Sequence, residues 1–327
     1  MTCRCIGISI CSFPDAWTGT WYSSRRGELV INSTHLGPIY TTQTKSVKYE
    51  CFITNGNVLV IKSEQFKLYG INFFAYFCLE MTPLSSASIL YYHRTRKDDL
   101  ANNETFKLSP TSVIMTENDV CDDTPTTTSW ELLVKKDSMP AAAVDCPKML
   151  HGEFNYTVTD GGVSSCGANS SWDGCSDRDT PSVNTTLCDG DVAFSANGVF
   201  QCVYTYVEEG NYTYVLVVNL DATTDESTTY RVTCMVMEEA DGRIQVSQTP
   251  QKCDTNQKPN STTSGTTIIL QPFANCVVPT TTTTAAVTTT TAATTTTTWP
   301  STASSLKAGH AHVFVSVLLG GCVWILQ

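Results

Sequence analysis

The sequence predicts an all-β protein with two disulfide-stabilised antiparallel β modules, followed by a disordered threonine-rich stalk. Short apolar segments with alternating polar residues recur through residues 11–276, and Asn-Gly, Glu-Gly and Asp-Gly turns separate them. Twelve cysteines lie in the same region, and no amphipathic pattern of three helical turns interrupts it. Short strands joined by tight turns form antiparallel meanders, so each module is expected to be a small barrel or sandwich.

The first module is expected at residues 11–140. Strands 49–54 and 57–62 flank Asn55-Gly56, which supplies the positive φ angles of a type I′ hairpin turn. Further strands are predicted at residues 71–80 and 88–95, and a last one at 130–135. Residues 140–144 are expected to form a short linker.

The second module is expected at residues 146–277. It opens with a strand in 146–158, and residues 160–189 are predicted to be mostly loop because they are rich in Gly, Ser and Asp. Strands return at 191–195, 199–207, 211–219, 229–237 and 243–247. Alternation places Tyr204 with Tyr206, and Tyr212 with Tyr214, on a shared face. Packing is their expected role, and an exposed aromatic binding face is the alternative.

The cysteines favour disulfides over metal sites, because no CxxC pair with zinc-finger spacing occurs. Setting aside Cys3 and Cys5 with a leader and Cys322 with the tail leaves four cysteines in the first module and eight in the second. Both numbers are even, as closed disulfide sets require, and this favours oxidising export. In the first module we expect the pairs Cys51–Cys78 and Cys11–Cys121. The twelve disulfide candidates are Cys11, Cys51, Cys78, Cys121, Cys146, Cys166, Cys175, Cys188, Cys202, Cys234, Cys253 and Cys276.

The first ten residues and the N-glycosylation sequons indicate export. Residues 1–10 are interpreted as the remnant of a secretory leader that is truncated in this sequence. Seven Asn-x-Ser/Thr sequons predict N-glycosylation. They are Asn32, Asn103, Asn155, Asn169, Asn184, Asn211 and Asn260.

The last fifty residues resemble a glycosylphosphatidylinositol (GPI) attachment signal. Residues 278–305 are expected to form a threonine-rich, O-glycosylated stalk, with a flexible unglycosylated linker as the alternative, and an apolar tail follows at 306–327. Ser301 or Ala303 is the predicted attachment residue, because two small residues follow each of them. A single-pass helix and a buried terminal helix remain alternatives. The expected location is therefore the outer leaflet of the plasma membrane.

Composition and motifs exclude several functions. The formal charge of −11 and the absence of a Lys/Arg cluster in the sequence argue against nucleic acid as a partner. We expect no enzyme activity and no cofactor, since His35, His93 and His151 are scattered and no catalytic or phosphate-binding motif occurs. The acidic groups at 177–179 and 189–191 are a weak calcium alternative, without the spacing of a known calcium loop.

The opening Cys11-Ser-Phe-Pro, followed by Gly19-Thr-Trp21, resembles a family of uncharacterised invertebrate extracellular proteins with tandem cysteine-rich domains of unknown function. In the second module, Cys146-Pro with Gly152-Glu-Phe-Asn-Tyr resembles the opening of the family's next domain, and Phe200-Gln-Cys202 continues the match. The resemblance covers most of residues 11–276. It implies secretion or surface display and supplies no activity.

Gly19-Thr-Trp21 is also similar to the first-strand motif of lipocalins, in which the tryptophan closes one end of a ligand calyx. Two functions follow as hypotheses. The first is a non-enzymatic cell-surface module that binds an extracellular protein or glycan, as an adhesion molecule, receptor or matrix component. The second is a carrier of a small apolar ligand, with a pocket lined by Trp21, Phe73, Phe74 and Phe77 in the first module.

Overall fold

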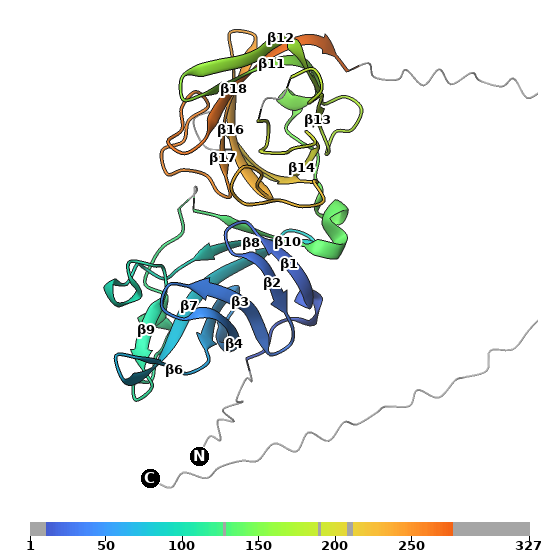
Figure 1. The fold of residues 1–327 in the computed structure, drawn as a ribbon. Coiled ribbons are helices and arrows are strands. Elements are labelled where there is room, and N and C mark those ends of the chain that lie inside the picture. Colours follow the sequence, from blue (N-terminus) through green and yellow to red (C-terminus); the bar gives the residue numbers. More distant parts are fainter. Residues whose placement is uncertain (1–10, 127–128, 189–190, 208–211, 277–327) are drawn as a thin grey trace, which may run out of the picture. The chain divides into compact units, whose positions relative to one another are not determined.

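The computed structural model describes residues 11–126, 129–188, 191–207 and 212–276, and everything below concerns these residues. It contains two antiparallel β sheets, drawn in blue to green and in green to orange in Figure 1. The prediction of an all-β fold is confirmed. Among the described residues, no helix is both long and apolar enough to cross a membrane.

The first sheet closes into an eight-stranded barrel. Its strands follow the order β5-β4-β3-β2-β1-β10-β8-β7, and β7 pairs with β5 to complete the circuit. The barrel strands are β1 (Gly19–Ser23), β2 (Gly27–Ile31), β3 (His35–Thr41), β4 (Lys45–Asn55), β5 (Val58–Ser63), β7 (Ile71–Pro83), β8 (Ser88–His93) and β10 (Glu131–Lys135). Two short strands, β6 (Phe66–Leu68) and β9 (Lys107–Pro110), also pair with β7.

Apolar side chains fill the barrel. Alternation along each strand turns every second residue inward, and Trp21, Tyr49 and Phe77 are the largest side chains that become buried. The Trp21 indole N–H donates a hydrogen bond of 2.7 Å to the carbonyl of Trp17, at the end of the short helix η1 (Asp15–Trp17). This bond satisfies the polar atom of a side chain that is 1% exposed.

The second sheet is an open half-barrel with the order β13-β12-β11-β18-β17-β16-β15-β14. Every neighbouring pair is antiparallel. The strands are β11 (Gly152–Asp160), β12 (Val163–Asp173), β13 (Ser182–Val183), β14 (Phe200–Val207), β15 (Thr213–Asn219), β16 (Val232–Ala240), β17 (Arg243–Pro250) and β18 (Thr266–Asn275).

The second sheet has apolar clusters on both faces. One is centred on Trp172 and Phe200, whose rings meet edge to face at 5.3 Å. The other combines side chains of both sheets, including Leu132 and Val218, and the two sheets belong to one compact unit. Tyr204, Tyr206, Tyr212 and Tyr214 pack in this cluster, and only Tyr214 is fully buried.

Short helices connect the strands. The segment predicted as a linker lies partly within the 3-10 helix η3 (Lys136–Ala142), and η4 (Lys148–Leu150) precedes β11. The remaining helices are η2 (Asp99–Ala101) and the four-residue α1 (Glu117–Val120), both between β8 and β10.

Four details differ from the sequence predictions. The segment predicted to be mostly loop contains the eleven-residue strand β12, and residues 191–195 form no strand. In the β4–β5 hairpin, Asn55 pairs with Val58, so the two loop residues are 56 and 57. Gly56 has a φ of +61°, which suits glycine in that loop. The strands β2, β3, β6, β9, β13 and β18 were not predicted.

All twelve candidate cysteines pair, but the pairing predicted for the first module is wrong. The bonds are Cys11–Cys51, Cys78–Cys121, Cys146–Cys202, Cys166–Cys188, Cys175–Cys276 and Cys234–Cys253. Cys11 and Cys51 pack against the interior cluster of the barrel, whereas Cys78 and Cys121 belong to a cluster on its outer face. Cys51 and Cys78 therefore lie on opposite faces of the sheet, and β5 separates their strands.

Candidate functional site

The turn between β1 and β2 places two arginines at one end of the barrel. Arg25 and Arg26 occupy this turn, and both backbone N–H groups point to the Ser23 hydroxyl, at 3.4 and 3.1 Å. Ser24, which precedes the two arginines, is anchored to β10. Its backbone N–H donates to the Leu132 carbonyl, and its hydroxyl accepts from the Leu132 backbone N–H. The turn is therefore fixed to the barrel wall.

Arg25 is held by a buried carboxylate. Its guanidinium Nη1 donates a 2.9 Å hydrogen bond to Oε1 of Glu131, which is 3% exposed. The Tyr91 hydroxyl donates to the other carboxylate oxygen at 2.6 Å, and Nε2 of His93 lies 3.6 Å from the same oxygen. Burial alone would raise the pKa of Glu131, but the charges of His93 and Arg25 and the Tyr91 hydrogen bond outweigh it and lower that pKa. Glu131 thus stays ionised and fixes Arg25.

Arg26 lies between the barrel interior and the solvent. Its guanidinium stacks on the Phe77 ring at 5.5 Å, and Nη1 reaches the carbonyl of Tyr40 at 3.4 Å. The Nε atom of Arg26 is buried and has no hydrogen-bond partner among the described residues. The Nε–H group of Arg26 therefore donates no hydrogen bond to the described residues.

The barrel interior leaves little free space. A cavity of about 20 Å³ lies between Arg26, His93 and apolar side chains including Leu36 and Met81. This volume accommodates about one water molecule. The predicted calyx for an apolar ligand needs several hundred Å³, and this interior cavity does not supply it.

Two larger pockets open beside the arginines. One has a volume of about 270 Å³ and is lined by Arg25, Arg26, Glu104 and residues 40–42. The other, of about 380 Å³, shares those three charged residues and adds Lys97, Lys252 and residues 103 and 105. We call the two pockets together the basic pocket, because four of their lining residues are cationic. They are Arg25, Arg26, Lys97 and Lys252.

Most of these cations lack a neutralising partner. Among the described residues, Arg26, Lys97 and Lys252 form no ion pair with a carboxylate within 4.0 Å. The single carboxylate in the lining, Glu104, accepts hydrogen bonds at Oε1 from the backbone N–H and the hydroxyl of Thr42. The pocket therefore carries excess positive charge in a protein whose net charge is −11.

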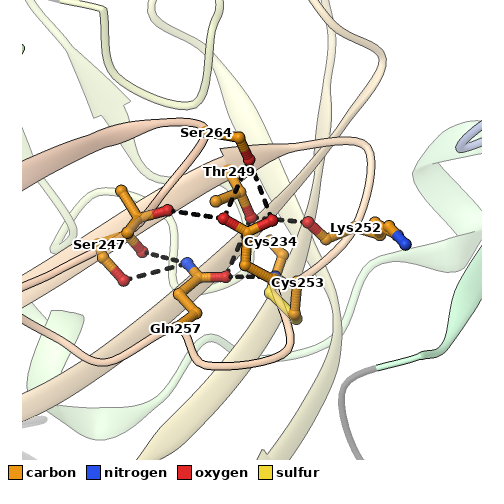
Figure 2. The surroundings of a disulfide bond; sticks show 9 residues. Cys234, Ser247, Thr249, Lys252, Cys253, Gln257 and Ser264 are labelled. Atoms are coloured by element: carbon orange, nitrogen blue, oxygen red, sulfur yellow. Dashed lines mark hydrogen bonds between the residues drawn. A yellow bond between two sulfur atoms is a disulfide. The ribbon is translucent and has the colours of Figure 1, made fainter.

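Lys252 reaches the pocket from a loop that is anchored on both sides. The loop follows β17, and the Cys234–Cys253 disulfide ties it to β16. Figure 2 shows the Lys252 side chain extending away from the hydrogen-bonded residues around that disulfide. The pKa of Lys252 is lowered, first by its partial burial and then by the charge of Arg25. A further positive charge, Lys97, acts in the same direction.

Hydrogen bonds inside the loop hold its shape. Gln257 is 3% exposed, and its amide nitrogen donates to the carbonyl and the hydroxyl of Ser247. Its amide oxygen accepts from the Thr249 hydroxyl and from the backbone N–H of Asp254 (Figure 2). The Ser264 hydroxyl donates to the Asp254 carboxylate at 3.0 Å. The Thr249 hydroxyl also donates to the Lys252 carbonyl at 2.6 Å, which joins the Lys252 backbone to this network.

The four aromatic residues predicted to line a ligand pocket do not lie together. Trp21, Phe73 and Phe77 belong to the interior cluster, whereas Phe74 packs on the outer face against Tyr76. Consecutive residues of a strand point to opposite faces, so Phe73 and Phe74 cannot share one pocket. These aromatic rings contribute to packing of the barrel.

The predicted modification sites are only partly described. Asn32, Asn103, Asn169, Asn184 and Asn260 are exposed, and Asn155 is half-buried. Asn211, Ser301 and Ala303, with the stalk and the tail, lie outside the described residues. Asn103 and the hydroxyl residue of its sequon, Thr105, both line the basic pocket.

Local sequence patterns contain almost no sign of this pocket. Its cations come from positions 25, 26, 97 and 252, and no Lys/Arg cluster marks them. Only the Arg25-Arg26 doublet before Gly27 was visible, and an arginine pair in a turn is an ordinary surface feature. Among the described residues, no group of three or more His, Cys, Asp or Glu side chains could hold a metal ion.

Residues 142–269 match a family model described as "Domain of unknown function (DUF7042)". The match covers most of the half-barrel, from η3 into β18, and none of the closed barrel. Comparison with curated proteins and with solved structures finds no match. The chain thus contains a disulfide-rich domain of unknown function and, ahead of it, an eight-stranded barrel.

Proposed function

We propose that this chain is a non-enzymatic extracellular binding protein, and that the basic pocket is its ligand-binding surface. Six disulfides fit a secreted or extracellular protein. The observation that carries the proposal is the set of cations without ion-pair partners around Arg26, on an otherwise acidic protein. Like charges that lie close together repel one another, and an anionic ligand would compensate that repulsion.

Binding to intact cells tests this function. The purified full chain is labelled and applied to cells, and its retention is compared with that of the double variant Lys97→Ala/Lys252→Ala. The control Lys67→Ala/Lys258→Ala removes the same charge at two exposed lysines that do not line the pocket. We expect the pocket variant alone to lose retention. Equal retention of all three proteins would refute a role of the pocket in binding.

We further propose that a GPI anchor holds the protein on the outer leaflet of the plasma membrane. The support is the order of a threonine-rich stretch, small residues around Ser301 and Ala303, and a final apolar segment. Treatment of expressing cells with phosphatidylinositol-specific phospholipase C should release the protein into the medium. Retention on the membrane after complete cleavage of a known GPI-anchored marker would reject the anchor.

A further inference from the structure

We infer that the basic pocket binds an acidic sugar, through a sulfate or carboxylate group on an extracellular glycan. This inference rests on the proposed binding function and adds the chemical class of the ligand. It follows from three properties of the pocket: its charge, its exposed aromatic ring and its one carboxylate.

The charge requires an anionic group. Arg25 is fixed by Glu131, and its side chain is 37% exposed. Arg26, Lys97 and Lys252 add three positive charges without an ion-pair partner within 4.0 Å among the described residues. Guanidinium groups bind sulfate and carboxylate oxygens through paired hydrogen bonds, whereas lysines act as point charges. An acidic group placed here would neutralise the repulsion that the cations exert on one another.

The neighbouring groups favour a sugar as the carrier of that charge. Tyr40 is 66% exposed and lies in the same lining as the two arginines. An exposed tyrosine ring offers an apolar face to the C–H side of a sugar. Glu104 accepts both of its described hydrogen bonds at Oε1, so Oε2 keeps acceptor capacity among the described residues. Sugar hydroxyls are donors for that oxygen.

The volume agrees with a short segment of a glycan. The two pockets measure about 270 and 380 Å³ and share Arg25, Arg26 and Glu104. Cavities of this size hold small ligands, so together they suit a short oligosaccharide segment. A nucleic acid needs a continuous basic footprint, and four cations on a protein with a net charge of −11 do not provide one.

Binding of defined oligosaccharides to the full chain tests the inference. The probes are a heparin hexasaccharide, a hyaluronan hexasaccharide that carries carboxylates without sulfates, and neutral maltohexaose. Calorimetry is performed on the native chain and on Asn103→Gly, which removes the sequon at the pocket. Binding of either acidic probe but not of maltohexaose is expected, and the comparison of the two acidic probes identifies sulfate or carboxylate as the recognised group. Failure of both acidic probes with both proteins would overturn the inference.

Matched variants assign the binding to this pocket. Lys97→Ala/Lys252→Ala should weaken binding at least about tenfold, because charge-assisted hydrogen bonds are among the strong ones, while Lys67→Ala/Lys258→Ala should not. Tyr40→Ala should also weaken binding, whereas Tyr69→Ala, at an 85% exposed tyrosine outside the lining, should not. Equal effects of pocket and control variants would overturn the inference. If cells still retain the protein through Lys97 and Lys252 after enzymatic removal of acidic glycans, the proposed function stands, the sugar is wrong, and an acidic protein is the ligand.

Discussion

Arg25 and Glu131 form an ion pair that joins the basic pocket to the barrel interior. The arginine side chain is 37% exposed and the carboxylate is 3% exposed, with 2.9 Å between Nη1 and Oε1. Tyr91 and His93 approach the other carboxylate oxygen from β8. The unfavourable desolvation of Glu131 is therefore offset by three polar neighbours, and Arg25 gains a fixed position at the pocket.

Removing the buried carboxylate should destabilise the barrel. We expect Glu131→Gln to lower the free energy of unfolding by about 3 kcal/mol, because breaking a buried ion pair leaves its partner uncompensated. Urea denaturation with the disulfides intact measures this change. The matched control is Glu50→Gln, which breaks the ion pair with Lys62 at a carboxylate that is 49% exposed. That surface pair should contribute at most about 1 kcal/mol. Equal losses in both variants would contradict the role assigned to Glu131.

The same carboxylate should make stability depend on acid pH. The pKa of Glu131 is lower in the folded protein than the value of about 4.3 for an unfolded chain. Its contribution is therefore complete above the unfolded value and decreases as the pH falls below it toward the folded value. Between about pH 5 and pH 3, the free energy of unfolding should decrease more steeply for the native chain than for Glu131→Gln. Parallel curves over this range would show that Glu131 carries no such linkage.

Strands were predicted correctly where alternating apolar residues and turn residues occur together, and they were missed where either signal is absent. The hairpin around Gly56 was predicted to within one residue, because apolar runs flank a glycine that accepts a positive φ. The strand β12 was missed because it is mostly exposed and reads as Ser, Gly and Asn, with no alternation that a buried face would impose. The strand forms because its backbone pairs with β11, and the β12 residues carry no local signal of that pairing.

The candidate site depends on topology that local patterns do not contain. Lys97 follows β8, whereas Lys252 follows β17 in the other sheet, and only the folded chain places both in one pocket lining. The predicted disulfide pairing of the first module was wrong for the same reason. The prediction treated the strands of Cys51 and Cys78 as neighbours in the sheet, but β5 pairs between them, and the two side chains face opposite sides of the sheet.

The Cys234–Cys253 disulfide should matter for ligand binding as well as for stability. Replacing both cysteines by alanine should cost about 2–4 kcal/mol of stability. It should also weaken binding of the acidic hexasaccharide, because the bond fixes the residue next to Lys252 (Figure 2). Cys166–Cys188 is a matched control, since its sequence separation is 22 and that of Cys234–Cys253 is 19. Its removal should cost similar stability and leave binding unchanged. Equal binding by the two double variants would contradict the assigned role of the loop.

Glycosylation of Asn103 should restrict access to the basic pocket. Asn103 is exposed, and both it and Thr105 of its sequon belong to the pocket lining. A glycan attached there begins at the pocket itself, so it competes for space with any large ligand. The variant Asn103→Gly suits this position, because φ is +60° and glycine adopts that conformation without strain.

Mass spectrometry should find Asn103 occupied in the native protein, and Asn103→Gly should bind long heparin chains more tightly. Asn169→Gln, at an exposed sequon on β12 that does not line the pocket, should leave this affinity unchanged. An occupied Asn103 whose removal does not change heparin affinity would show that the glycan projects away from the ligand.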